Sequence, residues 1–388
     1  MASISPPTYA KDGTPRYVVN YENENGDGRR KTFKKKIDAK RFKATVEADK
    51  ARGMFVDPHA GKAKFQDVAD GWLASQTFDI TSYGIHERAL RLHVYPVLGD
   101  TAIGAIRPST IQAWLRGLTM GSDTYKANTF GTVSAILNAA VDDRLIPSNP
   151  CKAGSVRAPK RGRADAHAWP RDAVASMLDN IDDWYRIAVV LAVGLGLRQG
   201  EVLGLSVNDV DFLAVDPEVR VRRQVRKFDN SRKAFRLPKG GHERTVPLAG
   251  YVRDELAAHL AKYPAQSVVL PWRDTDGKDV AHDLVLTTPA GGPIDRDDFN
   301  RKVWAPAREA AGIEARRENG MHALRHTYAS ELLDGGENIR ALADYLGHSD
   351  PGFTLRTYTH LMPSSAHRAR KTIDDAMKHY KSTTSRSA

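Results

Sequence analysis

The chain has 388 residues, of which 41% are hydrophobic and 27% charged, so its composition is that of a folded soluble protein and its length predicts two or three domains. The formal net charge is +11, and the single cysteine, Cys151, excludes an internal disulfide. The sequence lacks an apolar run of membrane-spanning length and its first residues lack a signal-peptide core, so we expect a cytoplasmic protein without membrane contact.

Residues 1–64 predict a small β-sheet-plus-helix domain. A strand at 17–21 and a return strand at 31–35 flank the turn residues 25–28, and the helix that follows has apolar Ala39, Phe42 and Val46 at helical spacing and ends at Gly53. This region holds 15 Lys and Arg against 8 Asp and Glu. Such an excess of positive charge suits a nucleic-acid-binding module.

Residues 65–150 predict an all-α domain, a compact bundle with amphipathic helices in four stretches: 65–76, 86–99, 109–118 and 124–146. The buried face of the last stretch comprises Phe130, Val133, Ile136, Leu137, Ala140 and Val141. Residues 151–164, rich in Pro and Gly, hold 5 basic and no acidic residues, which is typical of a linker that crosses an anionic surface.

Residues 165–388 predict a mixed α+β, mainly helical domain. Pro170 begins a helix, and a long apolar helix runs through 184–197. Basic strands at 219–228 and 232–240 form a hairpin around 229–231, and a third strand at 243–248 precedes a helix that starts near Gly250. Further helices are expected at 300–313, 322–336, 339–348 and 354–362, with an amphipathic tail helix at 365–380.

Basic residues also cluster within this last domain. Residues 219–244 carry 10 basic and 2 acidic residues. Basic clusters at three separated places favour an extended polyanion as partner, because each phosphate contact releases a condensed counterion. A solvated charged surface is the alternative interpretation.

Four short stretches of the last domain occur in one order: GLRQGEVLGL at 196–205, LPKGGHERTVPL at 237–248, HALRHTYASELLDGG at 322–336 and YLGHSDPGFTLRTYTH at 345–360. Together they resemble the tyrosine recombinases of the phage-integrase type, in particular lambda-type integrases with an N-terminal arm-binding domain. The resemblance covers about residues 165–365. It assigns catalytic roles to six residues: Arg198, Lys239, His322, Arg325, His348 and Tyr358.

The resemblance also predicts the domain roles. Residues 1–64 correspond to an arm-type DNA-binding domain, and residues 65–150 to a core-binding domain, a SAM-like helical bundle. Residues 151–164 form the basic linker, and residues 165–388 form the catalytic domain with its tail helix. The first of these correspondences rests on layout and charge rather than on a motif.

The chemistry of phosphodiester cleavage explains the cationic part of this set. Attack on the phosphate passes through a phosphorane-like state, whose negative charge Arg198 and Arg325 can bind with planar, permanently charged guanidinium groups. His348 can donate a further hydrogen bond to the phosphate. We expect no metal and no other cofactor, because protein cations replace a metal clamp and the phosphotyrosine link conserves the bond energy.

Proton transfer explains the other three residues. A free tyrosine has a pKa near 10, so Tyr358 needs a base or a strong positive field, and His322 is the candidate base. His322 lies three residues before Arg325, which puts both side chains on one face of a helix. Lys239, followed by two glycines at a hairpin turn, can protonate the leaving 5′-oxygen.

Structural roles are open for several of these residues. Arg198 could cap a helix, although we favour Glu201 as the carboxylate that orients it for catalysis. Lys239 could contact only the phosphate backbone, and we give His326 a packing role. Three other tyrosines compete with Tyr358: Tyr328, Tyr345 and Tyr380.

The expected function is site-specific DNA recombination through a 3′-phosphotyrosyl intermediate, to integrate and excise a phage or mobile element in the nucleoid of a bacterial host. The expected partners are double-stranded DNA with core and arm-type sites, a homotetramer on DNA, a host DNA-bending protein and an excision factor. The alternatives are an Xer-like chromosome or plasmid dimer resolvase, a relaxing topoisomerase and a catalytically silent DNA-binding regulator.

Overall fold

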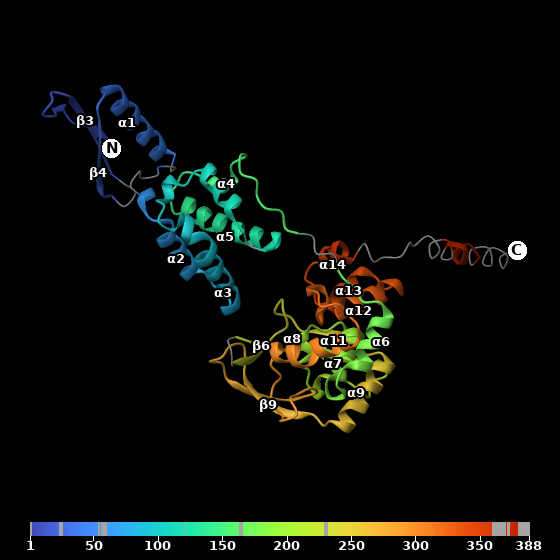
Figure 1. Cartoon of the computed structure of the whole chain (residues 1–388). Coiled ribbons are helices and arrows are strands. Elements are labelled where there is room, and N and C mark those ends of the chain that lie inside the picture. The colour runs from blue at the N-terminus through green and yellow to red at the C-terminus, as the bar shows by residue number, and fades with distance from the viewer. Residues whose placement is uncertain are drawn as a thin grey trace. The chain divides into compact units, whose positions relative to one another are not determined.

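A computed structural model describes residues 2–22, 26–52, 55, 60–119, 121–162, 166–228, 232–358, 370 and 373–378. Contacts divide the chain into two compact units, Met1–Arg163 and Ala164–Ala388; in Figure 1 the first runs from blue to green and the second from green to red. Over these residues, no helix combines the length and the apolar character that crossing a membrane would need.

The first unit begins with a four-stranded antiparallel sheet and one helix. Strand β3 is central and pairs with the other three strands. Helix α1 packs on the sheet through Phe42 and Val46, which contact Tyr21 and Phe55. The strand–strand–helix prediction is confirmed, although the return strand starts earlier than expected and ends at Phe33. The elements are β1 (Ser3–Ile4), β2 (Thr8–Tyr9), β3 (Pro15–Glu22), β4 (Gly28–Phe33) and α1 (Lys36–Ala51).

The return strand starts early because Gly28 already pairs with Glu22. The two shortest strands, β1 and β2, were not predicted from the sequence. Gly53, the predicted end of the helix, lies outside the described residues.

A helical bundle with its own core completes this unit. The four predicted helical stretches are confirmed, and Val133, Ile136 and Leu137 of the last one are fully buried. Phe130 and Val141 are only partly buried at the edge of that core. The helices are α2 (Phe65–Ser75), α3 (Ile80–Ala89) with a π-helical extension (Leu90–Gly99), α4 (Pro108–Gly117) and α5 (Asp123–Asp142).

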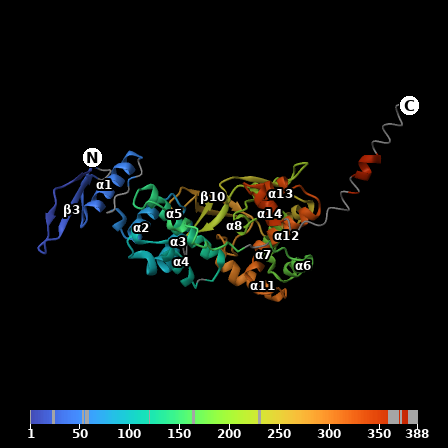
Figure 2. The same cartoon turned by 90° about the horizontal axis from the view of Figure 1, so that it is seen from above.

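The second unit is mainly helical around the apolar helix α7, of which six consecutive residues from Ile187 to Ala192 are at most 3% exposed. Helices α12, α13 and α14 lie together in Figures 1 and 2. The α-helices are α6 (Arg171–Asn180), α7 (Asp183–Leu195), α8 (Gln199–Val202), α9 (Gly250–Lys262), α10 (Arg296–Phe299), α11 (Ala305–Ala310), α12 (His322–Asp334), α13 (Ile339–Leu346) and α14 (Pro351–Tyr358). Of the predicted tail helix, only Arg370 and residues 373–378 fall within the described part.

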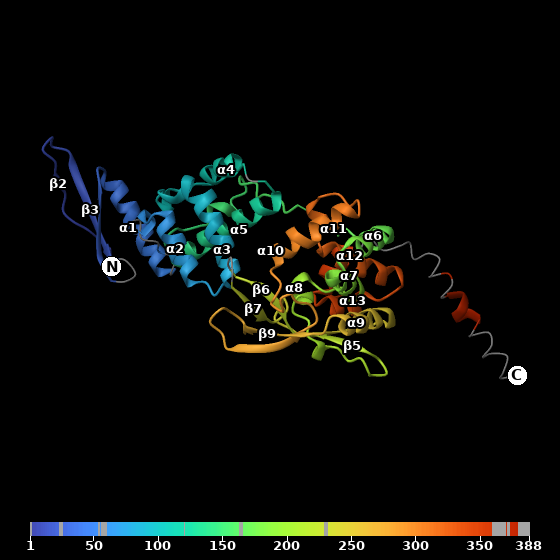
Figure 3. The same ribbon diagram turned by 60° about the horizontal axis from the view of Figure 1, so that its bottom comes forward.

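Three two-stranded antiparallel sheets flank these helices, and Figure 3 shows β6 and β7 beside β9. The predicted hairpin is confirmed in the pairing of β6 with β7, whose register joins Gln224 to Arg236 and Lys227 to Lys233. The third predicted strand, β8, pairs with β5. The strands are β5 (Glu218–Val221), β6 (Gln224–Lys227), β7 (Lys233–Arg236), β8 (Arg244–Pro247), β9 (Gln266–Pro271) and β10 (Asp279–Leu284).

The prediction of a single strand at 219–228 was wrong, because this stretch forms two strands, β5 and β6. The strand is interrupted at Arg222 and Arg223, where the Arg223 guanidinium donates to Asp209 at 2.6 and 2.9 Å. Both side chains are almost fully buried, so each charge needs the other. This ion pair lies at the break between β5 and β6, which pair in different sheets.

Candidate active site

Arg325 occupies the centre of the cluster that the sequence predicted. It lies on α12, is 1% exposed, and donates from Nη1 to the Gly196 carbonyl at 2.6 Å. Its Nη2 donates to the Leu346 carbonyl and lies 3.2 Å from Nε2 of His348. Both carbonyls belong to the last turns of helices, α7 and α13, where carbonyl groups lack partners within the helix and the helix dipole favours a cation.

Arg198 is held by Glu201. The Arg198 Nη1 donates to Glu201 Oε1 at 2.8 Å, and the Arg198 main-chain N–H donates to Oε2 at 2.9 Å. Arg198 therefore begins α8 as its N-terminal cap, and the capping interaction also fixes the direction of its side chain. The predicted role of Glu201 in orienting Arg198 agrees with these contacts.

A third arginine, Arg244, binds the same carboxylate from β8. Its Nη1 and Nη2 donate to the two oxygens of Glu201 at 2.9 and 2.6 Å, and its Nε donates to the Tyr345 carbonyl at 2.7 Å. Burial alone would raise the pKa of Glu201, but the hydrogen bond from Arg244 and the charges of Arg244 and Arg198 lower that pKa to about 2. The carboxylate is therefore ionised at neutral pH and ties Arg198 to Arg244.

His348 follows Gly347, which ends α13 in the left-handed conformation at φ 64°, as the sequence predicted. Its Nδ1 lies 2.7 Å from the Thr354 hydroxyl. Burial and the positive charges of Arg325 and Arg198 lower the pKa of His348 to about 3, so the ring is neutral. Because an arginine can only donate, Nε2 accepts from Arg325 here. For Nε2 to donate to a phosphate, as predicted, His348 must first give up the hydrogen bond that it accepts from Arg325.

Tyr358 ends α14 with its side chain 1% exposed. Its hydroxyl lies 2.8 Å from Nδ1 of His326, one turn along α12 from His322. Burial raises the pKa of Tyr358 to about 12, and the charges of Arg325 and Arg198 act in the opposite direction. The sequence argument gave His326 a packing role, whereas the structure puts its ring against the predicted nucleophile.

His322 is the first residue of α12, exposed at the edge of the cluster, and its ring centre lies 4.6 Å from that of His326. Desolvation by the surrounding protein and the charges of Arg325, Arg198 and Lys239 lower the pKa of His322 to about 4. His322 is neutral at physiological pH.

Lys239 lies in an exposed turn, and its charge contributes to lowering the pKa of His322. Gly240 and Gly241 continue the turn with φ values of 106° and 78°, which only glycine adopts without strain. The turn joins β7 to β8, which belong to different sheets, so the predicted location on a hairpin turn was wrong. Lys239 is thus exposed and near enough to His322 for its charge to act on that ring.

The sequence argument missed Arg244 and the contact of His326 with Tyr358. Arg244 was one of many basic residues in a basic stretch, and its carboxylate partner lies 43 positions earlier. A usable signal for His326 was its position directly after Arg325 in HALRHTYAS. Consecutive residues of a helix point in different directions, so His326 could be expected to contact another element than Arg325 does.

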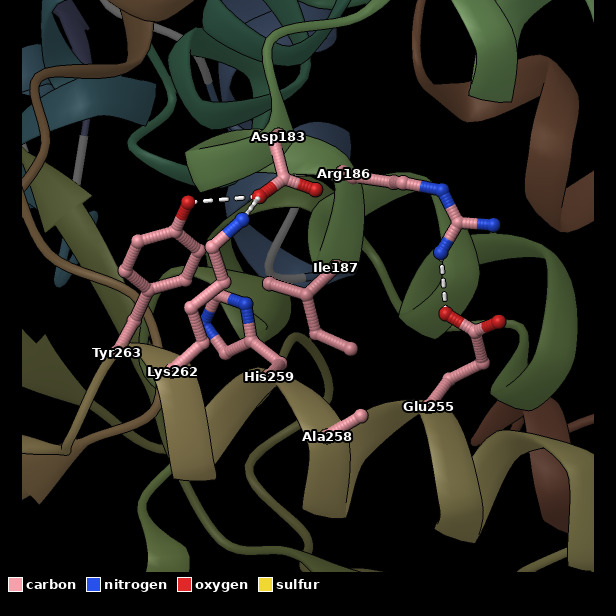
Figure 4. Close-up of a pocket in the computed structure, with 8 residues that line it drawn as sticks. All are labelled: Asp183, Arg186, Ile187, Glu255, Ala258, His259, Lys262 and Tyr263. Atoms are coloured by element: carbon pink, nitrogen blue, oxygen red, sulfur yellow. Dashed lines mark hydrogen bonds and ion pairs between the residues drawn. The ribbon is translucent and has the colours of Figure 1, made fainter.

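A separate pocket of about 150 Å³ lies between α7 and α9 (Figure 4). Its charged groups pair with one another: Arg186 with Glu255, and Lys262 and the Tyr263 hydroxyl with Asp183. These pairs fasten α9 to α7. The pocket is lined by residues other than the six predicted ones, so we associate the chemistry with the arginine cluster instead.

The fold and the cluster together define a DNA strand transferase of the tyrosine recombinase class. Residues 170–365 match the phage integrase family, and the chain belongs to that family. It is a site-specific DNA recombinase.

Relatives and solved structures agree with this assignment. The chain is 28% identical to a XerC-like tyrosine recombinase of Caldanaerobacter subterraneus subsp. tengcongensis, over 95% of this chain and 98% of the relative. Its fold is similar to the Tn1549 transposon integrase in complex with a circular intermediate DNA, with TM-score 0.65, 19% identity, and coverage of 80% and 99%. It is also similar to a lambda integrase tetramer bound to a Holliday junction, with TM-score 0.56, 16% identity, and coverage of 89% and 96%.

Proposed function

We propose that this recombinase cleaves one DNA strand by attack of Tyr358 on a phosphate, which leaves a 3′-phosphotyrosyl link and a free 5′-hydroxyl, and that it integrates and excises a phage or mobile element. The observation that carries the proposal is the position of the Tyr358 hydroxyl. It lies against a histidine and within the positive field of Arg325 and Arg198. Such a field stabilises a phenolate and a phosphorane alike.

The two arginines supply the cationic clamp for the phosphate. Arg325 is fixed by two carbonyls and Arg198 by Glu201, so both guanidinium groups are oriented before the substrate arrives. Preorganised donors cost no reorganisation during the reaction, which is the main source of their catalytic effect. His348 completes this side of the site once the phosphate takes over its contact with Arg325.

Lys239 is proposed as the general acid that protonates the leaving 5′-oxygen. Its exposed turn and its two left-handed glycines allow it to approach the DNA without disturbing β7 or β8. His322 stays our candidate for a proton-transfer or phosphate-binding role at the open edge of the cluster.

The nucleophile must become accessible for this reaction. With Tyr358 only 1% exposed, a phosphate reaches its oxygen only after a local opening. The exposed residues His322 and Lys239 mark the side from which the DNA approaches. We therefore propose that DNA binding opens the protein around the Tyr358 hydroxyl.

We further propose a three-part arrangement, with an arm-type DNA-binding domain at 1–64, a core-binding domain at 65–150, a basic linker at 151–164 and a catalytic domain at 165–388. The separate cores of the N-terminal sheet and the helical bundle support the first boundary. By analogy with the lambda integrase tetramer on a Holliday junction, four protomers act on two core sites, with a host DNA-bending protein and an excision factor as partners.

A second candidate function is Xer-like resolution of chromosome or plasmid dimers. The similarity to a XerC-like relative over nearly the whole chain favours it. The two functions differ in their substrates: an integrase joins two unlike attachment sites, whereas a dimer resolvase recombines two copies of one site. Recombination assays with both kinds of paired sites separate them.

The decisive test is covalent trapping on a nicked suicide substrate. We expect a protease-sensitive protein–DNA adduct, and peptide mapping by mass spectrometry to locate the linkage at Tyr358. The variant Tyr358→Phe should lose the adduct and keep DNA binding. The control variant Tyr345→Phe keeps the main-chain carbonyl that Arg244 uses and should form the adduct normally. An undiminished adduct in the Tyr358 variant refutes the assignment of the nucleophile.

Removal of residues 1–64 tests the arm-binding domain. Binding to arm-type sites should weaken, while cleavage of core-site DNA stays detectable. Loss of core cleavage in the shortened protein would contradict the proposed boundary.

A further inference from the structure

The residue that receives the proton of the nucleophile can be identified from the contacts of Tyr358. Its hydroxyl lies 2.8 Å from Nδ1 of His326, a normal hydrogen-bond distance, and the two ring centres are 5.5 Å apart. A general base has to lie within hydrogen-bond reach of the proton that it takes. His326 meets this condition in the structure as it stands.

We propose that His326, rather than His322, is the general base that accepts the phenolic proton when Tyr358 attacks the phosphate. The proposal rests on the proposed role of Tyr358 as nucleophile and adds a catalytic residue to it. His326 touches the reacting oxygen, whereas His322 lies at the exposed edge and contacts the ring of His326.

The step balances without a further reactant. The oxygen–phosphorus bond forms from Tyr358 while the bond from phosphorus to the 5′-oxygen breaks. The phenolic proton moves to Nδ1 of His326, and Lys239 supplies a proton to the 5′-oxygen. On rejoining, the incoming 5′-hydroxyl attacks phosphorus and gives its proton to the neutral Lys239, while the protonated His326 returns its proton to the departing oxygen of Tyr358.

The groups around the pair suit this transfer. Arg325, the residue before His326, is buried among main-chain carbonyls. Its charge and that of Arg198 act to lower the pKa of Tyr358. These cations stabilise a developing phenolate. They also disfavour a positive charge on a neighbouring imidazole, and the negative charge of a bound phosphate would offset this effect. Proton transfer to His326 is thus favoured at the stage when the substrate is bound.

Two substitutions at His326 separate proton transfer from positioning. In His326→Asn the amide oxygen stands near the position of Nδ1 and still accepts a hydrogen bond, but it cannot take up a proton. In His326→Phe the ring is kept and the acceptor is lost. The matched control is His322→Asn, which alters the neighbouring ring and leaves His326 in place.

The measurement is single-turnover cleavage of the suicide substrate by the full chain. Because a positioned base typically accelerates a step by about 100- to 10,000-fold, we expect His326→Asn to slow cleavage about 100-fold or more, with a rate that rises as the pH approaches the pKa of the tyrosine. His326→Phe should be at least as slow. His322→Asn should be slowed clearly less. DNA affinity and thermal melting, measured on each variant, report whether it is folded.

Two further arms locate the defect on the nucleophile. A substrate with a 5′-bridging sulfur has a leaving group that needs no proton, so it should rescue Lys239→Ala and fail to rescue His326→Asn. Added imidazole should restore cleavage to His326→Ala, where a space for it exists, and this result is not expected of a structural role. Rescue of His326→Asn by the sulfur substrate would overturn the proposal.

The inference and the proposed nucleophile fail in different ways. Near wild-type cleavage by His326→Asn, with the adduct still mapped to Tyr358, overturns only the role of His326. An adduct mapped to another residue overturns the nucleophile and the base together.

Discussion

Glu201 offers the sharpest test of how the arginine cluster is held together. The variant Glu201→Gln keeps the shape of the side chain and removes its charge. Arg244, whose side chain is 7% exposed, would then lack the carboxylate that it contacts through both Nη atoms. Removing one partner of a buried ion pair typically costs about 3–5 kcal/mol of folding free energy.

The pKa of Glu201 gives an independent magnitude. A pKa lowered from 4.5 to about 2 corresponds to about 3 kcal/mol of stabilisation by the ionised form. Because the folded-state pKa is depressed, this contribution is fully present above the unfolded pKa near 4.5. It is lost as the pH falls from there towards 2. The wild-type protein should therefore lose more stability across this window than the variant does.

The loss of folding free energy in Glu201→Gln is measured by urea unfolding. Amide hydrogen exchange, followed for the residues of α7 and α12, assigns that loss to the second unit. The matched control is Glu331→Gln, which breaks the exposed ion pair with Arg171, whose side chain is 77% exposed. Exposed pairs contribute at most about 1 kcal/mol, so the control should be nearly neutral. Equal losses in the two variants would refute the view that Glu201 organises the cluster.

Cleavage should report the same change, because Gln offers one uncharged oxygen to Arg198 and Arg244, which in the wild type share the two oxygens of the carboxylate. We expect Glu201→Gln to cleave the suicide substrate more slowly than the control variant does, at equal DNA binding.

Three other predictions follow from buried contacts. Gly196→Ala should destabilise the second unit by about 2–5 kcal/mol, since a left-handed alanine costs about 1–2 kcal/mol and overpacking about 1–3; its Cβ would lie 2.4 Å from the Tyr328 ring, and urea unfolding measures the loss. Asp209→Asn should cost about 3–5 kcal/mol by leaving buried Arg223 without its carboxylate, and unchanged melting would contradict this. Arg325→Lys should reduce single-turnover cleavage about 100-fold or more while DNA binding persists, because an ammonium cannot replace a guanidinium fork; wild-type rates would exclude that requirement.

The helical part of the molecule could be predicted because its signals are local. The apolar positions of α5 recur every three or four residues, and Gly347 marks the end of α13 by its own conformation. The three-residue spacing of His322 and Arg325 on α12 was equally readable. In each case the residues that decide the structure lie within a few positions of one another.

The missed features depend on partners far away in the sequence. The break between β5 and β6 lies at Arg223, whose partner Asp209 is 14 positions earlier, and nothing in the basic stretch itself indicates that the strand is interrupted. The β9–β10 hairpin was missed because only Val268 and Leu284 among its residues are fully buried, so alternation is weak. The contact between His326 and Tyr358 joins two helices 32 positions apart.

The charge balance of the cluster explains why these distant contacts matter for catalysis. Among the groups described here, Arg198 and Arg244 share the one carboxylate of Glu201, while Arg325 is bound by main-chain carbonyls. The cluster therefore carries excess positive charge, and burial together with this excess lowers the pKa values of His322 and His348. A phosphodiester supplies one compensating negative charge, and the phosphorane formed on attack supplies a second. The site consequently interacts more strongly with the transition state than with the bound DNA, which is the condition for accelerating the reaction.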